Sequence, residues 1–142
     1  VALGTDGCAS NNDLDMFDEL RTAALLAKGV SGDATAWNAA YALRAATLGG
    51  ARAIGLGERI GSLELGKQAD FICVQMGALE TQPMYHAISQ LVYSSGRSQV
   101  RDVWIGGERR LADGELVEFD SVGLLERVQR WRGTIAAVRK PA

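Results

Sequence analysis

The order of apolar and polar segments predicts an α/β fold, in which one strand and two helices precede a small antiparallel β unit and a final helix. Three observations lead to this prediction. The chain opens on the apolar run Val1–Leu3, which ends at Gly4 and the polar pair Thr5–Asp6. Two segments with a helical period of 3.6 residues follow, and beyond position 55 glycines separate short segments of alternating polarity.

The opening run is typical of a buried parallel strand, because such a strand is apolar along its length and ends where a polar loop begins. We therefore expect a strand here that places Asp6 at the carboxyl edge of a sheet. A single parallel strand has no sheet to join. The sequence is accordingly expected to start in the middle of a longer protein.

A first helix is expected after the polar loop 7–12, where Asn12 or Asp13 can cap its N-terminus. Acidic side chains crowd its first turns, where the helix dipole favours negative charge, and Lys28–Gly29 is typical of a helix end. Its apolar face consists of Met16, Phe17, Leu20, Ala24 and Ala27.

A second helix is expected over residues 35–48, with an interruption at Gly49–Gly50 and one more turn over residues 51–54. Alanine is frequent between positions 34 and 53, which predicts close packing against a neighbouring layer. The alternative is that these alanines only supply helix propensity.

The β unit is expected to contain strands at Ala69–Met76 and Val100–Ile105 and two shorter strands near residues 109–111 and 116–117. Gly106–Gly107 and Asp113–Gly114 are turn signals between them, and the period of residues 85–92 is undecided. A last helix carries an apolar row at Leu125, Val128, Trp131, Ile135 and Val138, with Arg127, Arg130, Arg132 and Arg139 on its other faces.

The composition, with 47% hydrophobic and 23% charged residues, is that of a globular protein. A net charge of −2 gives no basic face for nucleic acid, and the apolar runs fall short of the roughly 20 residues of a membrane span. Cys8 and Cys73 have no metal or disulfide spacing, so we expect reduced thiols and a cytoplasmic protein, with Cys73 in the core.

The loop from Gly4 to Asn12 is the densest polar cluster. A carboxylate at a strand end, such as Asp6, can bind a metal and accept a proton from a metal-activated water; capping a turn or the next helix is an equal alternative. Ser10, Asn11 and Asn12 can order an active-site rim, with loop capping as the alternative.

Catalytic zinc takes three protein ligands, and one carboxylate cannot hold it alone. The single histidine, His86, is expected to be a surface or packing residue. The sequence therefore contains no complete active site.

Several separate motifs, found in a fixed order, resemble the amidohydrolase superfamily. Its branch of 5-methylthioadenosine/S-adenosylhomocysteine deaminases and triazine chlorohydrolases is the most similar. The likeness covers nearly the whole chain. The motifs are LGTDG at 3–7, ASNN at 9–12, LDMF at 14–17, ELRTAALL at 19–26, AT at 46–47, GARA at 50–53, GSLELGKQAD at 61–70, ETQP at 80–83, QLVY at 90–93 and VWIGG at 103–107.

The resemblance implies the C-terminal portion of a metal-dependent (β/α)8 TIM barrel (residues 1–66), part of a small β-sandwich domain (67–120) and a C-terminal helix (121–142). In the family, a His-x-His pair, two further histidines and the aspartate that ends the eighth strand form the site. Only that aspartate has a counterpart here, Asp6, which would bind one divalent metal (zinc, with iron as the alternative) and shuttle a proton. The other ligands are absent from this sequence.

The implied activity is the deamination of 5-methylthioadenosine, S-adenosylhomocysteine or a related adenosine derivative by a metal-activated water, with the isolated segment inactive. The implied partners are the missing N-terminal part of the protein and a small nucleoside, with a homo-oligomer possible and neither nucleic acid nor membrane involved. One alternative is an amidohydrolase acting on guanine, a cytosine-like ring or a chlorotriazine. Another is a non-catalytic binding or assembly domain.

Overall fold

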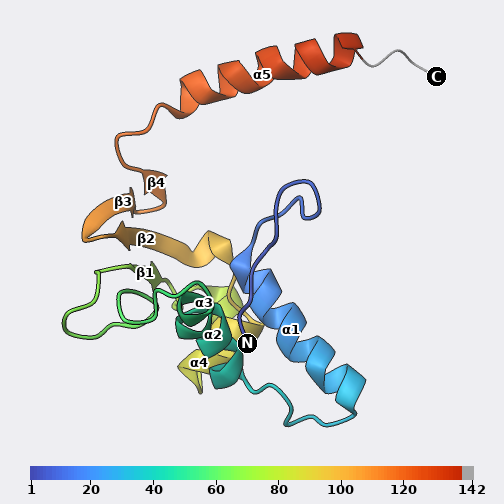
Figure 1. Ribbon diagram of the computed structural model, residues 1–142, viewed down its shortest axis with the longest axis vertical. Coiled ribbons are helices and arrows are strands. Elements are labelled where there is room, and N and C mark those ends of the chain that lie inside the picture. Colours follow the sequence, from blue (N-terminus) through green and yellow to red (C-terminus); the bar gives the residue numbers. More distant parts are fainter. Residues whose placement is uncertain (139–142) are drawn as a thin grey trace.

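The computed structural model describes residues 1–138 and places a group of helices beside a small antiparallel sheet, with the last helix set apart (Figure 1). The helices are α1 (Met16–Ser31), α2 (Ala39–Ala46), α3 (Leu48–Ala53), α4 (Ala87–Tyr93) and α5 (Ser121–Val138). The strands are β1 (Phe71–Val74), β2 (Val100–Ile105), β3 (Glu108–Ala112) and β4 (Glu115–Leu116). Short 3-10 turns lie at Leu79–Thr81 and Arg97–Gln99.

Helices α1, α2 and α4 form the core, and small side chains line their contacts. Ala24 of α1, Ala42 of α2 and Val92 of α4 are fully buried, and Leu20 and Ala39 complete the cluster. Side chains as small as alanine allow the helix axes to approach closely and to pack densely. The expected close packing of the alanine-rich segment is confirmed.

Helix α1 has the expected buried face but different ends. Its N-cap is Asp15, whose carboxylate accepts a hydrogen bond from the Phe17 amide at 2.8 Å, so the caps predicted at Asn12 and Asp13 were wrong. The helix also continues past Lys28–Gly29 to Ser31 and is capped by Gly32, which adopts the left-handed conformation (φ 66°). Gly29 remains helical, and Lys28 in the last turn donates to the Trp37 carbonyl at 3.0 Å.

The second helical segment breaks at a different residue from the one predicted. α2 starts after Asn38, and Thr47 (φ −112°, ψ −96°) separates it from α3, which contains Gly49 and Gly50. A Cβ on Gly49 would lie 2.5 Å from the carbonyl oxygen of Val1. Gly49 therefore does not interrupt the helix. Its missing side chain leaves room for the opening segment to cross α3 at this point.

The predicted opening strand is not formed. Residues 1–6 form no strand pairing, and the Leu3 amide donates to the Ala45 carbonyl of α2 at 3.3 Å. Val1 remains 79% exposed. A strand requires a neighbouring strand for its backbone groups, and within residues 1–138 none lies beside this segment.

The sheet has the order β1-β2-β3-β4 with every pair antiparallel. Gly106 and Gly107 both have positive φ (59° and 84°) and form the predicted tight hairpin between β2 and β3. Strand β1 is shorter than predicted, and Cys73 on it is exposed, because no described layer covers that side of an edge strand. The undecided segment 85–92 forms most of α4.

A charged pair and an aromatic stack hold β1, β2 and β3 together. The Phe71 and Trp104 rings stack with centroids 4.6 Å apart, and the Arg109 guanidinium lies 5.3 Å from the Trp104 ring. The hydrogen bond from Arg109, followed by one from the Asp113 amide, lowers the pKa of Asp102. Such cross-strand pairs stabilise a small sheet that has little core of its own.

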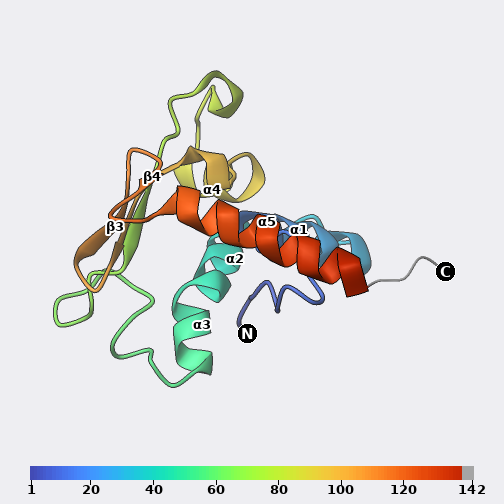
Figure 2. The same ribbon diagram turned by 90° about the horizontal axis from the view of Figure 1, so that it is seen from above.

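Helix α5 contains the expected apolar row, but its side chains are exposed. None of its residues is buried, and Trp131 is 67% exposed. Figures 1 and 2 show the helix extending away from the sheet. Arg139 and the remainder of the predicted helix to residue 142 lie outside the described residues. None of the helices in the described part combines the length and apolarity needed to cross a bilayer.

The connector between α3 and β1 depends on one lysine and two glycines. The Lys67 ammonium donates to the Gly57 carbonyl at 2.6 Å and to the Ser62 hydroxyl oxygen at 2.7 Å. Gly61 and Gly66 both have φ near +90°, but only at Gly61 would a Cβ meet another residue, at 2.6 Å from the Ala51 Cβ. The turn at Gly61 is therefore pressed against α3.

Replacing Gly61 by Ala should therefore destabilise the protein more than the matched change Gly66→Ala. Both changes incur left-handed strain of about 1–2 kcal/mol, and Gly61→Ala adds an overpacking cost of about 1–3 kcal/mol. Thermal unfolding midpoints of the two variants of the intact protein measure the difference. Equal midpoints would contradict the close contact.

Candidate active-site loop

Asp6 stands at the end of the opening segment with its carboxylate held by two donors. Its backbone is left-handed (φ 58°), a conformation that aspartate tolerates better than most residues. The Ser10 hydroxyl donates to Oδ2 at 2.7 Å and the Gly7 amide donates to Oδ1 at 2.8 Å. Both hydrogen bonds lower the pKa of Asp6 below its usual value of 3.8, and the bond from Ser10 has the larger effect. The exposed carboxylate is therefore ionised at neutral pH.

A tight turn brings Ser10 to Asp6. The Gly7 carbonyl accepts hydrogen bonds from the Ser10 and Asn11 amides, both at 3.0 Å. The Asn11 side chain then donates to Glu19 of α1 at 2.7 Å and accepts from the Asp13 amide at 3.0 Å. The predicted rim residues therefore divide into Ser10, which contacts Asp6, and Asn11, which anchors the loop to α1.

Asn12 contributes to neither group. It is exposed, and its side chain makes no hydrogen bond with any residue from 1 to 138. His86 is also exposed and accepts a hydrogen bond from the Ser89 amide (3.2 Å) as the N-cap of α4. The expected surface position of His86 is confirmed, and this histidine is engaged at a helix end.

The residues present suit Asp6 as the donor of one metal ligand and no more. Within the described part of the chain, Asp6 belongs to no group of three carboxylate, histidine or cysteine ligand atoms. Each of its oxygens accepts one hydrogen bond and keeps another lone pair. A catalytic zinc ion takes three protein ligands, so its other ligands would have to come from residues beyond those described.

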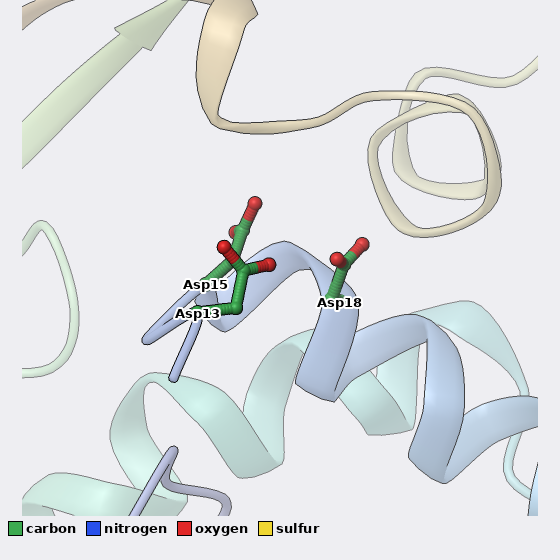
Figure 3. Close-up of side chains that lie close together, drawn as sticks. All are labelled: Asp13, Asp15 and Asp18. Carbon is green, nitrogen blue, oxygen red and sulfur yellow. The ribbon is translucent and has the colours of Figure 1, made fainter. Parts of the chain in front are cut away.

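Asp13, Asp15 and Asp18 do bring their carboxylates together, within 4.8 Å of one another, at the start of α1 (Figure 3). Arg97 pairs with Asp13 at 2.6 Å, and Arg21 pairs with Asp18 at 3.0 Å. Asp15 accepts the capping hydrogen bond of the helix. Each carboxylate thus has a protein partner, and the cluster joins the start of α1 to the segment that follows α4.

A broad apolar hollow of about 960 Å³ lies between α2, α3, the connector and the first two strands. Leu43, Ile54, Ile60 and Phe71 are among its lining residues, and Asp6 is not. The hollow is therefore separate from the Asp6 loop and consists of uncovered apolar surface.

Comparison with known proteins identifies the class to which this loop and fold belong. The model of the amidohydrolase family matches residues 1–110. Because this match takes in more than half of the chain, the chain belongs to the amidohydrolase family.

Individual proteins that resemble the chain are much longer. A 5-methylthioadenosine/S-adenosylhomocysteine deaminase of Teredinibacter turnerae is 47% identical over 139 residues, which are 98% of this chain and 31% of that protein. The crystal structure of an adenosine deaminase from Xanthomonas campestris with bound zinc superposes with a TM-score of 0.93 at 61% identity, covering 96% of this chain and 31% of that one. The chain spans about 31% of the length of these proteins.

A more distant likeness concerns the fold alone. An atrazine chlorohydrolase from Arthrobacter aurescens, complexed with zinc, superposes with a TM-score of 0.78 at 24% identity. The superposition covers 87% of this chain and 28% of that one. The two chains therefore share a fold over the superposed part.

The capping role of Asp15 predicts a graded response to substitution. Asp15→Ala should lower the free energy of unfolding by about 1 kcal/mol, because the Phe17 amide loses its acceptor. Asp15→Asn keeps an acceptor and should cost less. Urea unfolding of the intact protein followed by circular dichroism measures both, and equal losses would assign the effect to charge rather than capping.

Proposed function

We propose that the chain is the C-terminal part of a metal-dependent hydrolase that deaminates 5-methylthioadenosine, S-adenosylhomocysteine or a related adenosine derivative. The observation that carries this proposal is Asp6, an ionised carboxylate held by two donors in a chain of the amidohydrolase family. Relatives named as deaminases of these nucleosides support the substrate class.

In this proposal Asp6 has two tasks. As an ionised carboxylate it provides one ligand to a divalent metal, zinc or iron. When bound, that metal lowers the pKa of a water so that it acts as the nucleophile. In this role Asp6 would accept the proton of the attacking water and deliver it to the leaving ammonia, as a general acid–base group. Zinc in the Xanthomonas campestris adenosine deaminase crystal structure supports zinc as the metal.

The remainder of the protein is the proposed partner of this segment. Residues 1–66 would complete a (β/α)8 barrel, residues 67–120 would belong to a β-sandwich, and residues 121–142 would form the final helix. The unpaired opening segment, the apolar hollow and the exposed row of α5 all present surface that a folded protein ordinarily covers. The histidine ligands and the nucleoside pocket would come from that remainder.

Asp6→Asn in the intact protein should reduce kcat for ammonia release from S-adenosylhomocysteine by at least about 100-fold, because the amide cannot take up the proton. Asp33→Asn is the matched control, since the Asp33 carboxylate is exposed and likewise accepts a hydroxyl and an amide hydrogen bond, from Thr35. Undiminished turnover by Asp6→Asn would refute the proposed role. Activity on a chlorotriazine with none on the nucleosides would instead favour the alternative substrate class.

The isolated 142-residue segment should not unfold cooperatively and should bind no stoichiometric zinc, whereas the intact protein should hold about one ion per chain. The reason is that one carboxylate cannot retain the ion and the apolar faces lack their cover. Thermal circular dichroism with metal analysis tests both statements. A cooperative melt of a monomeric segment would contradict the proposed dependence on the remainder.

A further inference from the structure

We propose that Ser10 is a positioning residue that fixes the orientation of the Asp6 carboxylate, an inference that rests on the proposed role of Asp6. The Ser10 hydroxyl and the Gly7 amide bond to different oxygens of the same carboxylate, at 2.7 and 2.8 Å. One hydrogen bond would leave the group free to rotate. Two bonds on two oxygens set the plane of the carboxylate and the direction of its remaining lone pairs.

The hydroxyl has two possible acceptors and favours the carboxylate. Ser10 Oγ lies 2.7 Å from Asp6 Oδ2 and 3.1 Å from the Gly7 carbonyl oxygen. A hydroxyl carries one hydrogen, and a hydrogen bond to an ionised acceptor is shorter and stronger than one to a neutral carbonyl. The hydrogen is therefore directed at Asp6, and the carbonyl would take it only if Asp6 moved.

Ser10 can act as a fixed donor because its own turn is anchored to the core. The Gly7 carbonyl closes the turn on the Ser10 and Asn11 amides, and Asn11 binds Glu19 on α1 at 2.7 Å. The next residue of α1, Leu20, is buried in the helical core. A continuous series of contacts thus connects the buried helix to an otherwise exposed carboxylate.

The Gly7 donor is a backbone amide that side-chain substitution leaves in place, so Ser10 is the member of the pair that can be removed. Second-layer hydrogen bonds to metal ligands contribute about 10- to 100-fold in metal affinity or activity. Ser10→Ala removes the hydroxyl, and Ser10→Thr keeps it at an exposed position that accepts the added methyl group. Ser31→Ala is the matched control, because the Ser31 hydroxyl is exposed and bonds only to backbone atoms of its own helix and loop.

The test measures kcat, KM and zinc affinity, the last by chelator competition, in the intact protein. We expect Ser10→Ala to lower kcat and zinc affinity by about 10-fold or more with KM changed less than about threefold. Ser10→Thr and Ser31→Ala should stay within about threefold of the unmodified protein. In the Asp6→Asn background, Ser10→Ala should have no further effect, because Ser10 acts through that carboxylate.

Unchanged kcat and zinc affinity in Ser10→Ala, alongside an inactive Asp6→Asn, would overturn the positioning role while leaving the proposed function intact. Equal losses in the Ala and Thr variants would also overturn it, since the hydroxyl would not be the cause. An active Asp6→Asn variant would refute the proposed function itself, whatever the Ser10 variants show.

Discussion

The close approach of α1, α2 and α4 is the constraint on which the rest of the described structure depends. This approach depends on the small side chains of Ala24 and Ala42, because a larger side chain at either position would separate the helices. The opening segment is joined to this group by the bond from Leu3 to α2, and the Asp6 loop by the bond from Asn11 to α1. The position of the candidate catalytic carboxylate is thus a consequence of helix packing rather than of a sheet within this chain.

The described part of the chain also leaves a large apolar surface uncovered. The hollow beside α2 and α3 and the row along α5 are both exposed, although burial of such surface is the main favourable term in folding. Most helical stability in proteins comes from the packing of an apolar face, and α5 buries none of its residues. These surfaces and the share of its relatives that the chain spans are the observations behind the proposal that the segment is stable only together with the remainder of the protein.

Periodicity predicted the helices and the hairpin because local residue types determine them, as at Gly106–Gly107, where both residues need positive φ. It failed where a distant contact decides the outcome. Gly49 lies within α3 and accommodates the crossing of Val1 instead of interrupting the helix as predicted, and the exposure of Cys73 depends on what covers β1. In the candidate site, the polar loop was recognisable as a cluster, but the bond between Ser10 and Asp6 was not, because it requires the turn closed by the Gly7 carbonyl.

The geometry around Asp6 is largely local even though the proposed site is not. Both donors to the carboxylate lie within four residues of it, and the anchor on α1 lies thirteen residues away. A carboxylate preorganised by its own loop loses little rotational freedom when further ligands arrive, which lowers the entropic cost of completing a metal site. Residues distant in the sequence need then supply only the remaining ligands and the pocket. Under the proposed function, the orientation of one metal ligand would thus be set by a short loop, while the binding of the ion would depend on the whole protein.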